Sequence, residues 1–256
     1  MKKGLCSVTF RALSADKVAE LAVKAGLDCI EWGADIHVPP DNPDNARKVA
    51  KICRDLNIDT PSYGSYYRLD GGDFDSVSET AEILGARDIR VWAGTKDAEL
   101  FTLKEYGLLV KDLKRIAATA ASRGQNVCFE HHFDTYGNNA ANVKKLIEDA
   151  GENNVFTYWQ PLYWLHGKTE NENAVNLKDL IGLKGLIKNV HVYNWKGRQR
   201  LPLSDAMEDW KSYFKLTEAE NCYLEFVRSD DETAFFEDAK CLACLLYTSD
   251  AADDKA

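Results

Sequence analysis

The sequence lacks any apolar stretch close to the roughly 20 residues that a helix needs to cross a membrane. It also lacks a basic excess, because 41 acidic residues against 32 basic residues give a net charge of −9. The N-terminal MKKGLCSVTFR opens with lysines, but Arg11 ends the apolar run too early for a signal peptide. We therefore expect a cytoplasmic protein with no membrane span and no broad basic surface for nucleic acid.

The seven cysteines are an odd number and are scattered along the chain. Without a secretion signal, this usage predicts reduced and mostly buried thiols instead of a disulfide framework. Cys241 and Cys244 have the CxxC spacing of some redox and zinc sites. We interpret this spacing as accidental, because Cys244 begins an unusual C-terminal segment.

This segment, residues 244–256, differs from the rest of the chain. Its sequence from Cys244 to Asp254, CLLYTSDAADD, resembles the in-frame translation of a transposase-type sequencing adapter. An ordinary acidic tail is the alternative. We expect one domain over residues 1–243, a last helix that is cut short, and a non-native tail over 244–256 with no structural role.

Short apolar, β-branched or aromatic runs alternate with segments of helical periodicity along the whole chain. The eight runs are GLCSVTF, DCIEW, IDTPSYG, DIRVWAG, NVCFEHH, VFTYWQ, KNVHVYNW and CYLEFV. The segments between them show helix signals, such as Ser14 as a candidate N-cap before ADKVAELAVKAG. Eight strand–helix units predict an α/β fold, a single-domain (β/α)₈ TIM barrel. A doubly wound sheet is the alternative, but no GxGxxG follows the first run.

Four residues that can bind metal end four successive predicted strands. They are Glu130 in VCFE, Gln160 in FTYWQ, His191 in NVHV and Glu225 in CYLEF. Catalytic groups of such barrels lie at the C-terminal ends of the strands, so these side chains are expected to converge. Each alone has an ordinary interpretation as an ion-pair partner or a core residue. Together they would be costly to bury without a cation, and their donor set suits Mn²⁺, Mg²⁺ or Co²⁺.

Several segments carry a resemblance to a known family: IEWGADIHVPP, PSYGSYYR, IRVWAG, FEHH, YWQP, HVYNW and LEFVR. They resemble the xylose-isomerase-like barrel superfamily, and more closely proteins labelled sugar phosphate isomerase/epimerase. The resemblance extends to about Ala243. In that superfamily Glu, Asp, His and Glu at the ends of strands five to eight hold a metal. The resemblance therefore implies Glu130, His191 and Glu225 as ligands, with Gln160 where Asp is usual.

The resemblance implies a metal-dependent isomerase or epimerase that acts on a sugar, sugar phosphate or sugar acid through an enediolate. Glu130 and Glu225 would then bind the metal and also transfer protons. Tyr163 stands where the epimerases commonly have a substrate-binding His. Two alternatives stay open: an inosose-type keto-polyol dehydratase, and a non-catalytic sugar-binding barrel. An endonuclease IV-type nuclease is disfavoured, because its multi-zinc site is rich in His and this chain has five.

Aromatic and basic residues lie at or just past the predicted strand ends. Aromatic faces suit the apolar side of a sugar ring, and guanidinium groups suit phosphate or carboxylate. The candidate substrate-binding residues are His37, Tyr66, Arg90, Trp92, His132, Arg200 and Arg228. We expect a small carbohydrate as the partner and leave a homo-oligomer open.

Overall fold

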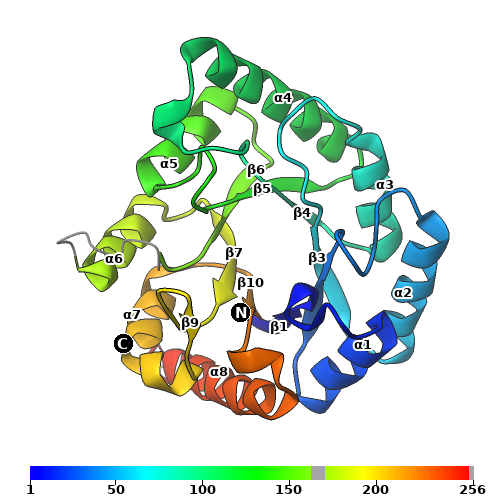
Figure 1. The fold of residues 1–256 in the computed structure, drawn as a ribbon, viewed down its shortest axis with the longest axis vertical. Helices are drawn as coiled ribbons and strands as arrows, with labels where there is room; N and C mark the ends of the chain where they lie inside the picture. Colours follow the sequence, from blue (N-terminus) through cyan, green and yellow to red (C-terminus); the bar gives the residue numbers. More distant parts are fainter. Residues whose placement is uncertain (163–170, 254–256) are drawn as a thin grey trace.

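The computed structural model describes residues 1–162 and 171–253. In these residues, eight parallel strands form a closed barrel and eight α-helices surround it (Figure 1). The barrel strands are β1 (Lys2–Cys6), β2 (Cys29–Gly33), β3 (Asp59–Gly64), β4 (Asp88–Val91), β5 (Asn126–Glu130), β6 (Val155–Trp159), β7 (Ile187–Val192) and β10 (Asn221–Leu224). The predicted single-domain (β/α)₈ barrel is confirmed. Tyr163 lies outside the described residues.

The helices follow the strands in chain order. They are α1 (Ala15–Lys24), α2 (Pro43–Asp55), α3 (Asp75–Leu84), α4 (Leu103–Ser122), α5 (Ala140–Ala150), α6 (Glu172–Gly182), α7 (Met207–Leu216) and α8 (Glu232–Asp253). A capping box begins α4, since Thr102 and Glu105 each bond the other's backbone N–H. Ser14 occupies the N-cap position of α1 as predicted, but its side chain makes no capping bond. Burial of the apolar faces therefore stabilises α1 more than its cap does.

Successive side chains along each strand point alternately into two apolar layers. Along β10, Cys222 and Leu224 belong to the large core between strands and helices, whereas Tyr223 belongs to a smaller cluster inside the barrel. Tyr158 and Cys128 lie in the same inner cluster. Residues that face inward near the ends of the strands therefore point to one small interior.

A polar ladder crosses the barrel near the beginnings of the strands. Asp88 of β4 accepts hydrogen bonds from Asn126 Nδ2 and Asn189 Nδ2, both at 2.8 Å. Asn221 Nδ2 donates to Asn189 Oδ1, also at 2.8 Å. Burial raises the pKa of Asp88, and the two amide donors partly counteract this. The ladder gives a buried carboxylate the partners that it needs away from water.

The connection after β7 contains a short antiparallel hairpin, β8 (Trp195–Lys196) and β9 (Gln199–Arg200). The sequence pattern did not predict this hairpin. The first predicted run is also shorter than expected as a strand, because Ser7–Phe10 forms a 3₁₀ turn after β1. Both irregular segments lie beside the ends of strands, where a site is expected.

The seven cysteines form no disulfide among the described residues, and all but Cys244 are buried, as the sequence predicted. No helix within the described ranges is long and apolar enough to cross a membrane.

Helix α8 continues beyond the expected boundary at Ala243. Leu245 is 1% exposed and Leu246 is 8% exposed, and both belong to the large core. Their apolar side chains pack in the same core as Leu242. The expectation that residues 244–256 have no structural role stays a prediction, and these two leucines provide a way to test it.

Two truncated chains test whether the C-terminal segment contributes to stability. A chain that ends at Ala243 loses two buried leucines, and we expect its melting temperature to fall by about 5 °C or more. A chain that ends at Tyr247 keeps both, and we expect it to melt within about 1 °C of the full chain. Scanning calorimetry of the three proteins is the measurement. Equal melting temperatures for all three would support a segment without structural role.

Candidate metal and catalytic site

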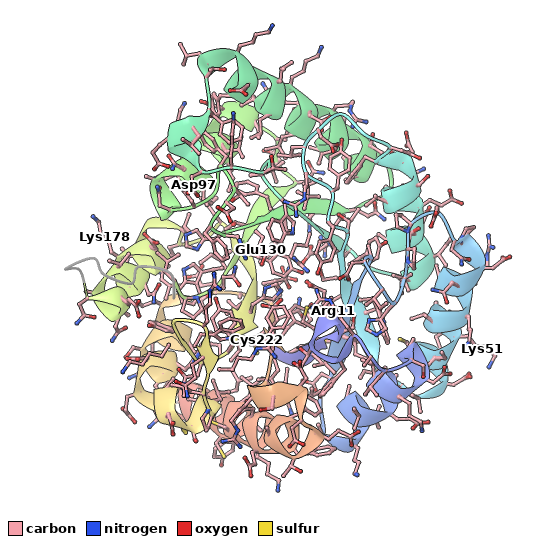
Figure 2. All side chains as sticks on the ribbon, viewed as in Figure 1. Arg11, Lys51, Asp97, Glu130, Lys178 and Cys222 are labelled. Carbon is pink, nitrogen blue, oxygen red and sulfur yellow. The ribbon has the colours of Figure 1, made fainter. Side chains whose placement is uncertain are left out.

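The four predicted metal ligands lie together inside the barrel. Glu130 ends β5, His191 lies in β7, and Gln160 and Glu225 directly follow β6 and β10. All four side chains are buried. His191 Nδ1 lies 3.5 Å from Glu130 Oε1 and 3.5 Å from Glu225 Oε2. Figure 2 shows Glu130 within the ring of helices, whereas Lys51 and Lys178 lie on its outer edge.

Gln160 contacts the same cluster of side chains through its amide nitrogen. Its Nε2 donates to Glu130 Oε1 at 3.2 Å and to the backbone carbonyl of His131 at 3.0 Å. A backbone carbonyl accepts only from a donor, so these bonds assign Nε2 to this side. The amide oxygen is then the atom that takes part in neither of these two contacts.

Two further charged residues complete the cluster, and the sequence pattern did not mark one of them. Glu31 of β2 is fully buried and was missed as a site residue. Arg90 of β4 donates from Nε to Glu31 Oε1 at 3.0 Å and from Nη1 to Glu130 Oε2 at 2.5 Å. A Cβ atom at Gly64 would lie 2.6 Å from Arg90 Nη2, so glycine leaves room for this guanidinium.

The carboxyl groups differ in their electrostatic surroundings. Burial alone would raise the pKa of Glu31, but the charges of Arg90 and His191 lower it to about 2. Burial acts in the same direction on Glu130, and Arg90 holds the pKa of that carboxyl well below its usual range. For Glu225 burial prevails, and its pKa is raised. Without a bound ion, the site thus contains two carboxyl groups that stay ionised, Glu31 and Glu130, and a third, Glu225, that keeps a proton more readily.

His191 lies among three carboxylates. Burial favours its neutral form, but the charges of Glu225 and Glu31 outweigh burial and raise its pKa well above the usual value. Its Nε2 lies 3.4 Å from Glu31 Oε1. Neither ring nitrogen makes a hydrogen bond of regular geometry to any described residue. A buried imidazole without such bonds, facing two carboxylates, is an arrangement that a metal ion would satisfy.

The donor set fits a divalent ion. Ligands about 2.0–2.2 Å from one ion lie roughly 3–3.5 Å from one another, as the His191 and carboxylate atoms do. With a neutral imidazole, the ionised Glu31, Glu130 and Glu225 together with Arg90 give the site a net charge of −2. The Cys6, His191 and Glu225 ligand atoms also lie within 4.8 Å of one another. Burial raises the pKa of the Cys6 thiol, however, so it is the weaker donor.

A cavity of about 160 Å³ leads to this cluster. Its lining residues are Arg11, Tyr66, Arg90, Trp92, Glu130, His132, Gln160, Tyr193, Trp195, Glu225 and Phe226. The rings of Tyr66 and Trp92 are stacked with centroids 6.2 Å apart, and the ring centroids of Trp92 and His132 lie 4.5 Å apart. The cavity therefore has an aromatic wall above a charged floor, which suits a small polar molecule with an apolar face.

The model of the xylose isomerase-like TIM barrel family matches residues 19–243 of this chain. The chain belongs to this family. The resemblance inferred from the sequence segments is thereby confirmed. No curated protein sequence matches the chain.

Solved structures with the same fold share little sequence with this family member. The protein AsbF of Bacillus anthracis, described as a probable 3-DHS dehydratase, is 16% identical with a TM-score of 0.78, and 95% of this chain and 99% of that chain are covered. An L-ribulose 3-epimerase is 17% identical with a TM-score of 0.76, covering 99% and 97%. The IolI protein with a bound zinc atom is 17% identical with a TM-score of 0.74, covering 97% and 99%.

Four of the seven predicted substrate-binding residues of this xylose isomerase-like barrel line the cavity: Tyr66, Arg90, Trp92 and His132. Arg90 lines it from below, with its guanidinium already bonded to two carboxylates. The sequence did not single out Arg11, Tyr193, Trp195 or Phe226, which also line it.

The remaining three predicted residues do not line this cavity. His37 lies within hydrogen-bonding distance of Ser7 Oγ and the Leu13 carbonyl, at 3.0 and 3.1 Å, and borders a separate hollow. Arg200 forms an ion pair with Asp230 beside an adjoining hollow. Arg228 pairs with Glu237 at 3.3 Å, where both side chains are largely exposed. Each of these polar groups is therefore held by a neighbour outside the cavity.

Two cavity residues of this family member have a backbone that non-glycine residues rarely adopt. Tyr66 has a φ of 60° and Phe226 a φ of 52°. The backbone N–H of Phe226 donates to Thr9 Oγ1 at 3.1 Å, which helps to hold it. Arg11 joins the two, since its Nη2 donates to Tyr66 Oη at 3.0 Å and its guanidinium lies 5.6 Å from the Phe226 ring. Such strained positions cluster at ligand sites, where they aim a side chain.

Proposed function

We propose that this protein is a divalent-metal-dependent isomerase or epimerase that acts on a sugar, sugar phosphate or sugar acid through an enediolate. The observation that carries the proposal is the pair Glu130 and Glu225. Both face one nitrogen of His191 at 3.5 Å beside a cavity, and their surroundings move their pKa values in opposite directions. Such a pair serves proton removal at one place and proton delivery at another.

In this proposal Glu130, Glu225 and His191 Nδ1 would hold the ion, and the amide oxygen of Gln160 would complete the set. The bound ion supplies Lewis acidity for the negative charge that develops on neighbouring substrate oxygens. Mn²⁺, Mg²⁺ and Co²⁺ all suit a donor set of oxygens and one imidazole.

The chain's own groups have separate tasks. Arg90 keeps Glu130 ionised, so Glu130 can take a proton from a carbon next to a carbonyl. Glu225, which faces the same His191 nitrogen from the end of β10, can deliver one to the opposite face. Trp92 and Tyr66 offer flat faces to the carbon side of a sugar.

A dehydratase acting on a keto-polyol is the second candidate. The place of Glu225 in the cavity lining favours it, because a carboxyl group there can equally deliver a proton to a leaving hydroxide. A structural neighbour described as a dehydratase and another described as an epimerase share this barrel. A non-catalytic sugar-binding barrel is the third, and it needs no bound metal.

One experiment distinguishes the three candidates. The protein is incubated with Mn²⁺ in deuterium oxide together with ketoses, aldoses, their phosphates and sugar acids, and inososes. Deuterium on a carbon of a product that is an isomer of the substrate supports isomerisation or epimerisation. A product that lacks one water relative to the substrate supports the dehydratase. Binding without either change, by a protein that retains no metal, supports the binding barrel.

Gln160 provides a direct test of the metal site. Gln160→Leu removes the amide oxygen and the bond to Glu130, and we expect it to weaken Mn²⁺ binding about tenfold, or ~1.4 kcal/mol. Gln160→Asp adds a negative charge among the ligands, and we expect it to tighten binding by a similar factor. Isothermal calorimetry measures both. Wild-type affinity in both variants would show that Gln160 does not touch the ion.

A further inference from the structure

The buried carboxylate of Glu31 has no task in the proton transfer described above. It is fully buried and does not line the cavity, so it cannot touch a substrate there. Its Oε1 nevertheless lies 3.4 Å from His191 Nε2, on the side of the ring opposite to the proposed metal ligands. A buried charge that contacts a ligand residue but not the cavity acts through that residue.

The position of Glu31 is fixed from several strands. Arg90 approaches Oε1 with Nε at 3.0 Å and Nη2 at 2.9 Å. Cys6 Sγ donates to the same oxygen at 3.2 Å, and Ser62 Oγ donates to Oε2 at 3.3 Å. These contacts come from β1, β3 and β4, so the carboxylate has little freedom to turn away from His191.

A neutral imidazole has one N–H and one lone pair, and an acceptor at one nitrogen decides which is which. Carboxylates that accept the second N–H of a metal-bound His orient the ring and make it a stronger ligand. Here Glu31 faces Nε2, while Glu130 and Glu225 both face Nδ1. A proton at Nε2 therefore leaves the Nδ1 lone pair directed between the two carboxylates.

We propose that Glu31 is a positioning residue that holds the Nε2 proton of His191, and thereby presents Nδ1 to the divalent ion. The proposal rests on the metal site of the proposed function. It assigns Arg90 a second task, because the guanidinium joins Glu31 to Glu130 and sets the distance between the orienting carboxylate and a ligand carboxylate.

The test uses the full-length protein with Mn²⁺ for affinity and Zn²⁺, which is diamagnetic, for NMR. Glu31→Gln keeps the size of the side chain but removes the charge, and we expect it to weaken Mn²⁺ binding by about 10- to 100-fold. In the Zn²⁺ complex of the wild-type protein with ¹⁵N-labelled histidine, we expect a protonated Nε2 and a metal-bound Nδ1 on His191, assigned with His191→Asn. In Glu31→Gln the Nε2 proton should exchange faster with water.

Ser62→Ala is the matched control, because it removes a hydrogen bond to Glu31 but leaves the carboxylate facing His191. We expect its Mn²⁺ affinity to stay within about twofold of the wild type. If Glu31→Gln does not fold, Glu31→Asp replaces it, since Asp keeps the charge beside Arg90 but does not reach His191. Unchanged Mn²⁺ affinity in the Glu31 variant, or zinc on Nε2, would overturn the proposal alone. A wild-type protein that binds neither ion would overturn it together with the metal site.

Discussion

Glu130→Gln and Glu225→Gln are each expected to lower turnover by on the order of 10²-fold or more, even at saturating Mn²⁺. Glutamine keeps the size and one oxygen ligand of glutamate but cannot accept the substrate proton. A carboxylate that only held the ion would be compensated by more metal, whereas one that also moves a proton would not. The measurement is kcat as a function of Mn²⁺ concentration for the wild type and both variants.

The pair also distinguishes two reaction types. Epimerisation needs proton removal and delivery on opposite faces, so both variants should be severely impaired. Isomerisation by a single base should leave one variant close to the wild type once metal is saturating. Recovery of both variants by excess metal would contradict the proton-transfer roles and leave Glu130 and Glu225 as ligands only.

Arg90→Met is expected to lower the free energy of unfolding by about 3–5 kcal/mol at pH 7. Arg90 is 2% exposed and is the cation bonded to both Glu31 and Glu130, so its loss deprives two buried carboxylates of their guanidinium counter-charge. Denaturant unfolding measures the change. Arg47→Met is the control, because Arg47 and Asp44 form an exposed pair, and its effect should stay below about 1 kcal/mol.

The effect of Arg90→Met should also depend on pH. In the wild type the pKa of Glu31 is lowered from 4.5 to about 2, so its stabilising contribution is present above about pH 4.5 and is lost as the pH falls toward 2. Without Arg90, burial raises this pKa, and the folded variant then gains stability as the pH falls. The difference between variant and wild type should therefore shrink from pH 7 to pH 5. A constant difference would show that Arg90 acts through packing and not through charge.

The fold could be predicted from the sequence because its strands are continuous apolar runs separated by amphipathic helices. Parallel strands that are buried on both faces have this pattern, and the runs DCIEW and NVCFEHH are typical of it. The hairpin at Trp195–Arg200 could not be predicted, because its two-residue strands are stabilised by ring contacts with Phe226 that only the folded chain provides. The extent of α8 depends in the same way on where Leu245 and Leu246 pack.

The candidate site was predictable only in part. Residues at the ends of successive strands converge by barrel geometry, which is why Glu130, His191 and Glu225 lie together in the structure. Glu31 lies inside a strand of fully buried residues, and no spacing relates it to His191, 160 positions later in the chain. Arg200 was a predicted substrate-binding residue, but it does not line the cavity, because it forms an ion pair with Asp230 that the sequence alone does not reveal.

The polar ladder at the base of the barrel has a consequence for how the sheet closes. Asp88 lies opposite Asn126 in the β4–β5 register, and Asn221 lies opposite Asn189 in the β7–β10 register. Sliding any of these strands by one residue would turn its polar side chain to the other face and break at least one hydrogen bond of this buried ladder. A slip at any one of the four strands is therefore penalised. The ladder favours the native strand alignment, and with it the alignment of the side chains at the other end of the same strands.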